Sequence, residues 1–377
     1  MRNARKLLEH VKESASCFTT YKQRKLIFKG EIFDGYEFNK FLSNVKFVVN
    51  KMSFSELYLD FYYKKVADDS IIVNLEIIIA MLFESGINTI FIDFKKLDIN
   101  DSKIGYLGNS IISKCGKILR KNKFLDEYYS EFTIFRNTLR YYIKDKTRNE
   151  KMNSRILYDI ITWVIADKNI DRKIIGNFAK AVVEIADNMR HSDSDCIVSI
   201  KSNPLINVVD RKTYYSLSVC VVNIGDIFIY TPLENSIKNN NLIGSTKNIV
   251  EKAMPIHEKF YNENYNLDRF CMVTVFQNSV TTNNVNDYGG NGLPYFIKVL
   301  IENSNFNNCY LISGSNVLFF KEHYISLNNG VVSFNKECCY YDKPPDPEVF
   351  KDAPTFYPGT MYNLEFIIKE NIWKLLY

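Results

Sequence analysis

Residues 174–191 read IIGNFAKAVVEIADNMRH, and their pattern decides how the second half of the chain folds. An apolar residue recurs every three or four positions, which is the spacing of one face of an α-helix. Asp171, just before the run, is a residue type that caps helix N-termini. The apolar stripe consists of Ile174, Phe178, Val182, Ile185 and Met189. We therefore expect a helix that buries this stripe against a sheet.

A second row of side chains follows the flank of the stripe. Its members are Asn177, Ala181, Glu184, Asn188 and His191. Spacings of three and four place these side chains one above another on one helix face. Taken alone, such a row is more often a solvated helix edge than a site, so its meaning depends on the segments around it.

Segments with strand character surround this helix. The runs at 196–202 and 214–226 are rich in β-branched and aromatic residues, and GGNG at 289–292 precedes another helical pattern. Further strands are expected at 309–313, 316–320, 330–335 and 360–368. The second half is thus predicted to place helices on a mixed, largely antiparallel sheet.

The first half predicts a separate α/β unit. ELYLDFYY (56–63) and TIFIDF (89–94) have strand composition, and VNLEIIIAMLFESG (73–86) between them indicates a buried helix. The polar segment KDKTRNEKMNS (144–154) either separates two domains or forms a loop within one larger fold. With a boundary there, we expect a helical extension at 1–40, an α/β domain at 41–148 and a second domain at 149–377.

Composition narrows the function classes. The 377 residues carry a formal charge of +5, which is too small an excess to indicate a nucleic-acid partner. The eight cysteines show no ligand spacing, which favours reduced thiols. The N-terminus lacks the apolar core of a signal peptide, and no apolar run approaches the ~18 residues of a membrane span. A cytoplasmic protein without a membrane span is expected.

Four stretches in order, EIADNMRHS, VVNIGD, GGNGLPYFIKVLIEN and YPGTMYNLEFII, together resemble the ATP-binding domain of the GHKL superfamily. This superfamily includes gyrase, heat-shock chaperone, histidine kinase and mismatch-repair ATPases. The resemblance covers roughly residues 150–377 and implies a GHKL-type α/β sandwich that binds ATP with Mg²⁺. Order and spacing together are more specific than any single stretch.

The resemblance implies catalytic and metal-binding roles for the first stretch. Glu184 matches the glutamate that activates the attacking water, and Asn188 matches the asparagine whose amide oxygen binds Mg²⁺. One protein oxygen is sufficient, because Mg²⁺ usually keeps several waters and takes its other ligands from phosphates.

The other stretches imply contacts to nucleotide. Asn223 stands where the family has the aspartate that contacts adenine, and Gly225 matches the first glycine of that motif, whereas Ile227 replaces the second. A neutral amide forms a weaker hydrogen bond than a carboxylate. Thr360 matches a threonine near adenine. The expected phosphate-binding glycines are Gly289, Gly290 and Gly292.

We also derive expectations for two further segments from family resemblances. Residues 230–288 would form a mobile lid over the nucleotide, since their composition suits a loop. The domain at 41–148 more faintly resembles STAS domains, the fold of anti-sigma-factor antagonists. ADDSI (67–71) places Ser70 near the serine that is phosphorylated in some STAS proteins.

The leading hypothesis is a cytoplasmic, Mg²⁺-dependent ATPase with slow turnover, acting as a nucleotide switch for an unidentified protein partner or for its own N-terminal domain. A serine kinase of the anti-sigma type is one alternative. A degenerate module that binds nucleotide or protein without catalysis is the other, because Asn223 and Ile227 depart from the family pattern. The sequence leaves homodimerisation open.

Overall fold

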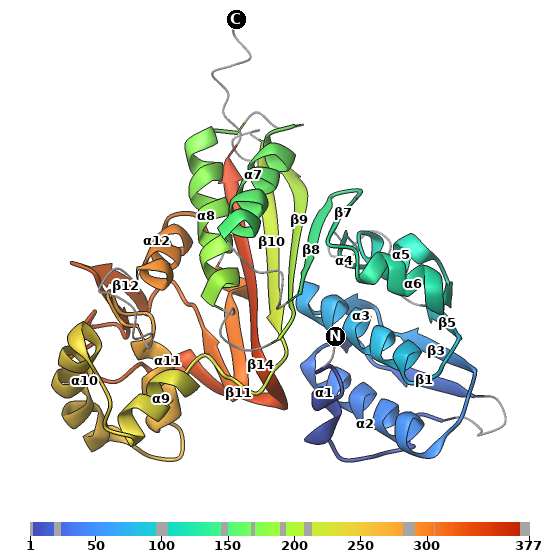
Figure 1. Ribbon diagram of the computed structural model, residues 1–377, viewed down its shortest axis with the longest axis horizontal. Helices are drawn as coiled ribbons and strands as arrows, with labels where there is room; N and C mark the ends of the chain where they lie inside the picture. Colours follow the sequence, from blue (N-terminus) through green and yellow to red (C-terminus); the bar gives the residue numbers. More distant parts are fainter. Residues whose placement is uncertain are drawn as a thin grey trace, which may run out of the picture.

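The computed structural model describes residues 3–18, 24–95, 105–144, 150–166, 170–188, 194–206, 213–281, 291–304 and 306–369. In these ranges the chain is a mixed α/β protein whose helices pack against two larger β-sheets (Figure 1). One sheet belongs to the N-terminal part, coloured blue to teal, and the other is built from green to red strands. The expected α/β fold class is confirmed at this level.

The first sheet has the strand order β1-β3-β5-β6. β1, β3 and β5 are parallel, and β6 is antiparallel to β5. The predicted strand–helix–strand unit is confirmed as β3 (Glu56–Tyr62), α3 (Asp69–Glu84) and β5 (Thr89–Phe94). The other elements here are α1 (Lys6–Glu9), β1 (Lys25–Lys29), β2 (Ile32–Phe33), α2 (Gly35–Lys51), β4 (Lys65–Val66), α4 (Gly105–Gly108), α5 (Ile111–Cys115), β6 (Ile118–Arg120) and α6 (Lys121–Tyr128).

Residues 1–40 do not form the helical extension that we expected. Strand β1 lies within this range and pairs in parallel with β3, so the segment contributes the edge of the first sheet. Leu26 and Phe28 are fully buried, whereas Lys29 is exposed. The physical reason is the alternation of KLIFK, which buries every second residue of a strand.

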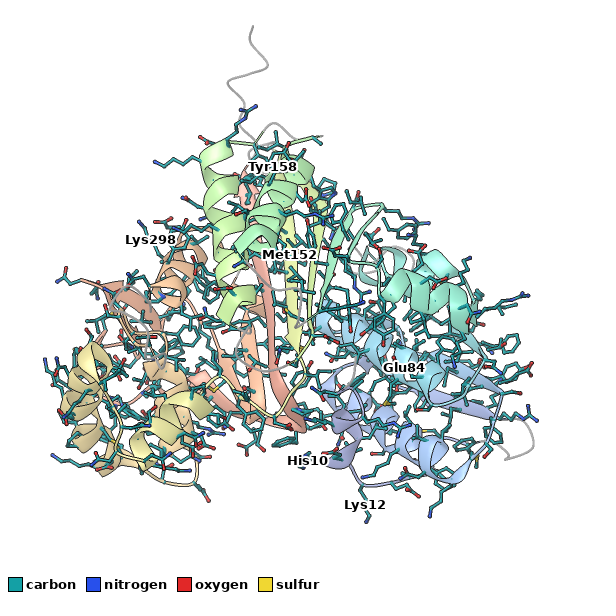
Figure 2. The ribbon with its side chains drawn as sticks, in the orientation of Figure 1. His10, Lys12, Glu84, Met152, Tyr158 and Lys298 are labelled. Atoms are coloured by element: carbon teal, nitrogen blue, oxygen red, sulfur yellow. The ribbon has the colours of Figure 1, made fainter. Side chains whose placement is uncertain are left out.

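The second sheet has the order β11-β14-β10-β9-β8-β7, and every described pairing in it is antiparallel. Helices α7, α8 and α12 cover one face, and the N-terminal part lies beside the other (Figure 1). The elements are β7 (Phe132–Phe135), β8 (Thr138–Ile143), α7 (Glu150–Ala166), α8 (Arg172–Asn188), β9 (Cys196–Ile206), β10 (Thr213–Asn223), α12 (Gly292–Asn303), β11 (Tyr310–Phe319), the β12 (Ile325–Asn328) and β13 (Val331–Phe334) hairpin, and β14 (Phe350–Lys369). Helix α7 buries Met152 and leaves Tyr158 in solvent (Figure 2).

The second sheet begins before the expected boundary. The β7–β8 hairpin precedes the polar segment at 144–154, yet β8 pairs with β9 along six residues. Leu139, Tyr141 and Ile143 of β8 join the core under α7 and α8. Residues 150–154 of the polar segment begin α7, so the expected boundary at 148/149 falls inside the second structural unit.

The expected lid is helical in its described part. Within 213–281 the chain forms α9 (Thr231–Lys238), α10 (Gly244–His257), the 3₁₀ turn Glu258–Phe260 and α11 (Leu267–Thr274). Leu233, Val250 and Phe270 are buried in the core of the second unit. The prediction of a loop over these residues was wrong, because scattered apolar side chains anchor short helices in an otherwise polar sequence.

Helix α3 lies between the two sheets and is buried on every side from Asp69 to Phe83. It packs on the first sheet and also contacts β10 and β14 of the second. Strand β10 alternates accordingly: Val219 and Val221 face the helices α7 and α8, whereas Cys220 and Val222 join the core around α3. The second sheet is thus buried on both faces.

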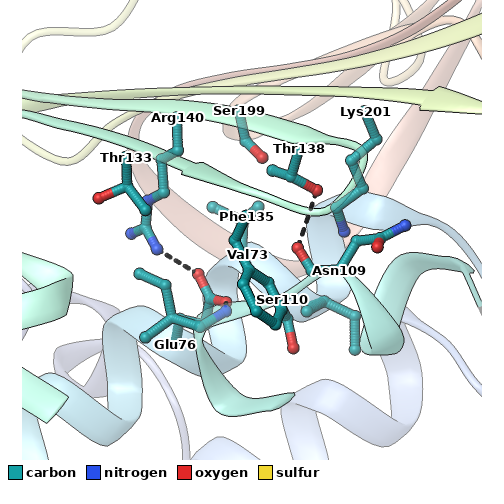
Figure 3. Close-up of a pocket in the computed structure, with 12 residues that line it drawn as sticks. Val73, Glu76, Asn109, Ser110, Thr133, Phe135, Thr138, Arg140, Ser199 and Lys201 are labelled. Carbon is teal, nitrogen blue, oxygen red and sulfur yellow. Dashed lines mark hydrogen bonds and ion pairs between the residues drawn. The ribbon is translucent and has the colours of Figure 1, made fainter. Parts of the chain in front are cut away.

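Two ion pairs cross this interface at depth. Asp69 of α3 pairs with Lys201 of β9, and both side chains are almost fully buried. Glu76 pairs with Arg140 Nη1 of β8 at 2.6 Å, and its other carboxylate oxygen accepts a hydrogen bond from the backbone N–H of Ile111 at 2.7 Å. Figure 3 shows Glu76 reaching toward Arg140 beside a cavity of about 20 Å³. These charges hold α3 in one position against the second sheet.

Breaking one of these pairs should strongly destabilise the protein. Arg140→Met is expected to lower the free energy of unfolding by about 3–5 kcal/mol, because Glu76 is left as an unpaired buried carboxylate. Arg155→Met is the matched control, since Arg155 pairs with Glu131 at 3.1 Å on the surface; it should cost no more than about 1 kcal/mol. Equal losses in urea denaturation would contradict the importance of the interface pair.

Candidate functional site

The polar row on α8 faces α12. Helix α8 packs between α7 and α12, and the hydroxyl of Tyr295 on α12 donates to Asn177 Oδ1 at 3.1 Å. The ammonium group of Lys180 lies 4.5 Å from the centre of the Tyr295 ring. From Asn177 to Glu184 the row therefore lies at an interface between two helices and is not a solvated helix edge.

Glu184 lies against the first residue of α12. A Cβ atom on Gly292 would overlap the Glu184 carboxylate oxygen and lie 3.1 Å from its carboxyl carbon, so a larger residue here would displace the carboxylate. The positive end of the α12 dipole favours a carboxylate there. Burial raises the pKa of the Glu184 carboxyl, and Lys180 opposes that rise. Among the described residues, no ion pair or hydrogen bond to this carboxylate occurs.

Asn188 ends α8 one turn after Glu184 and is exposed. Its side-chain N–H donates to the backbone carbonyl of Glu184 at 2.8 Å. This bond uses the amide nitrogen and orients the side chain, while the oxygen is the atom that Mg²⁺ would take. The predicted base and the predicted metal ligand thus lie together at the C-terminal end of α8.

The second and fourth sequence stretches meet where β10 and β14 pair. Asn223 is the register partner of Thr360, and both are buried. A Cβ on Gly359, which has φ +100°, would lie 2.9 Å from Gly225 N, so this glycine is required for the close approach. The backbone N–H of Gly225 donates to Pro358 O at 3.3 Å. Asn223, Gly225 and Thr360 therefore form one packed corner.

Two serines complete this corner, and sequence reasoning missed both. The side-chain amide of Asn223 donates to Ser194 Oγ, which lies a few residues after α8. Ser313 Oγ on β11 is 3.0 Å from Thr360 Oγ1 and donates to the carbonyl of Gly359 at 2.8 Å. Serine is common in strands and loops, so neither residue carried a signal. Ser194 links the end of α8 to the corner.

The N-terminal segment contacts the same corner. The side-chain amide of Asn3 donates to Ile224 O at 3.2 Å, and Lys6 forms an ion pair with the exposed Asp226 at 2.5 Å. The centre of the His10 ring lies 3.9 Å from that of the Phe356 ring on β14. The turn after β10 is thus held by residues at the start of the chain.

Some expected site residues lie elsewhere. Gly289, Gly290 and His191 fall outside the described residues. Ile227 is half-buried next to the corner. Ser70 is buried at the start of α3, where its hydroxyl donates to Asp68 at 2.6 Å, so the folded protein does not present it to a kinase. The expectation of a phosphorylatable Ser70 is contradicted for this conformation.

Three further features concern the cysteines, metal-binding clusters and membrane spans. All eight cysteines are free thiols, as the sequence predicted. In the described residues, no group of three or more His, Cys, Asp or Glu side chains has metal-binding geometry, and none of the helices combines the length and hydropathy of a membrane span. No protein-family model, curated protein or solved structure matches the chain. The assignment of the site therefore depends on geometry.

A methyl group at position 292 tests the contact with Glu184. Gly292→Ala should push the carboxylate toward solvent and lower its pKa, because burial is what raises that pKa. Gly176→Ala on α8 is the control: its Cβ meets open space, so it should leave the pKa unchanged and stabilise the protein by about 0.5–1 kcal/mol. An NMR titration of the Glu184 carboxyl, assigned by its loss in Glu184→Gln, measures both. An unchanged pKa in Gly292→Ala would contradict the contact.

Proposed function

We propose that the protein binds ATP with Mg²⁺ in a GHKL-type site and hydrolyses it slowly, using nucleotide as a conformational switch. One observation carries the proposal: the Glu184 carboxylate lies against Gly292, the residue that begins α12. A helix N-terminus presents backbone N–H groups and a positive dipole end to phosphates. A carboxylate with a raised pKa beside that position suits a general base.

The remaining roles follow from position. Asn188 would contribute its amide oxygen to Mg²⁺, and Asn223 and Thr360 would face adenine from the corner of β10 and β14. Bound Mg²⁺ would neutralise phosphate charge. Gly292 and the N-terminal N–H groups of α12 would hold the phosphates, and Glu184 would accept the proton of the attacking water. The described residues therefore supply a base, one hard oxygen ligand and backbone donors within one helix pair.

A route for the switch also exists. The turn after β10 is tied to the N-terminal segment by Asn3 and Lys6, and the opposite face of β10 packs on α3. A change in this turn on nucleotide binding would reach the first unit, which we propose is a STAS-like domain that presents the state to a protein partner. Because α3 is bound by buried ion pairs, the two units would move as coupled bodies.

A specific observation favours the non-catalytic alternative. Asn223 is only 1% exposed, and its amide is engaged by Ser194, so the adenine position is partly filled by the protein itself. A module that binds nucleotide weakly, without turnover, would have this feature. The serine-kinase alternative stays a prediction, because it transfers phosphate to a serine elsewhere and the burial of Ser70 does not bear on it.

Three substitutions separate these functions. Glu184→Ala should leave ATP affinity near that of the parent and reduce hydrolysis by about 100- to 10,000-fold, since it removes the base. Asn188→Ala should weaken only the Mg²⁺-dependent part of binding. Asn223→Asp should tighten adenine binding, because a carboxylate is the stronger acceptor and Ser194 can rotate its hydroxyl to donate. Calorimetry and phosphate release measure these effects, and parent-like behaviour of all three variants would refute the site.

The rate of ATP hydrolysis should depend on pH through the ionisation of Glu184. Glu184 must be ionised to act as a base, so the rate should fall as pH drops through its raised pKa, above the ordinary value of about 4.3. Lys180→Met should move this fall in rate to higher pH, because Lys180 lowers the pKa of the Glu184 carboxyl. Lys173→Met, also on α8 but exposed and distant, is the control and should not move it. If the fall in rate at low pH shifted equally in both variants, Glu184 would not be the titrating base.

A further inference from the structure

A cavity of about 170 Å³ lies on the face of the second sheet opposite to α8 and α12. Its walls come from α2, α3, β11 and β14, and it is partly open to solvent. An apolar cavity of about 150 Å³ is large enough to bind benzene. The space between the two units therefore accommodates one ring-sized molecule.

Most of the lining is apolar. The apolar lining includes Phe38 of α2, Ile71 of α3, Ile312 and Val317 of β11, and Met361 of β14. Buried apolar walls of this kind gain free energy when an apolar body replaces water or empty space. The cavity thus selects for a compact hydrophobic ligand.

The lining includes one carboxylate residue, Asp68. Oδ1 of Asp68 accepts hydrogen bonds from Ser70 N at 3.0 Å and Ser70 Oγ at 2.6 Å, and Oδ2 accepts from the hydroxyl of Tyr310 at 2.7 Å. A carboxylate offers about four acceptor positions, so one remains on Oδ2. In the described chain no Lys or Arg forms an ion pair with Asp68, whereas its neighbour Asp69 is paired with Lys201. The free acceptor position and the negative charge both favour a cationic donor.

We propose that this cavity is a second binding site, which takes a small molecule with a compact apolar body and a protonated primary amine directed at Asp68. The inference goes beyond nucleotide binding and does not depend on it. Met361 precedes Tyr362 on β14 and follows Thr360, whose side chain lies on the opposite face of the sheet. An occupant of the cavity would therefore press on the strand that forms the adenine corner.

Benzylamine tests the proposal in the full chain without nucleotide. With ¹³C-methyl methionine labelling, the Met361 signal, assigned by Met361→Leu, should shift saturably, while Met272 in the other core should not. Toluene, which lacks the amine, should bind at least tenfold more weakly. Benzoate should not bind, because its charge repels Asp68. No saturable shift of Met361, or equal affinities for benzylamine and toluene, would overturn the proposal.

Two variants locate the interaction. Asp68→Asn should weaken benzylamine binding by roughly 10- to 100-fold and leave toluene binding unchanged; asparagine also caps helices, so α3 should persist. Asp171→Asn makes the same change at the start of α8 and should leave both affinities intact. Val317→Phe should fill the cavity and abolish binding of both probes. Unchanged benzylamine affinity in Asp68→Asn would refute the amine contact.

Discussion

The structure depends on helix α3, which is buried between two sheets and carries two charged side chains into that interface. An apolar helix could slide or rotate against a sheet at little cost. A buried carboxylate, in contrast, is tolerated only where a cationic side chain pairs with it. Asp69 must meet Lys201 on β9, and Glu76 must meet Arg140 on β8. The ion pairs thus specify how the first unit sits on the second, while hydrophobic burial supplies most of the driving force.

This arrangement places polar contacts on one face of β10 and β14 and an apolar core on the other face. On one face of β10 and β14, Asn223 lies opposite Thr360 and donates a hydrogen bond to Ser194. On the other face, Met361 and Val222 join the core around α3. Because successive residues of a strand point to opposite faces, a shift of either strand is felt in both places. The corner formed by Asn223 and Thr360 and the cavity beside Asp68 are therefore neighbours across a single sheet.

Local patterns predicted the elements whose signal is strong. The largely apolar run of α3 predicted a buried helix, and the three-and-four spacing placed Glu184 and Asn188 together on α8. The sequence did not predict several short elements. Strand β1 is five residues long and is fixed by pairing with β3, and the helices at 231–274 expose mostly polar residues. The pairing of Asp69 with Lys201 joins residues 132 positions apart and leaves no local pattern. Ser194 and Ser313 became visible only through the folded contacts of Asn223 and Thr360.

The central claim is that Glu184, Asn188 and the start of α12 form one nucleotide site. A crystal structure of the full chain with Mg²⁺ and a non-hydrolysable ATP analogue tests it most directly. The account predicts the terminal phosphate at the N-terminus of α12, the Asn188 amide oxygen on Mg²⁺ and the Glu184 carboxylate within reach of a water beside that phosphate. An analogue bound elsewhere, or a saturated crystal with no nucleotide between α8 and α12, would contradict the claim.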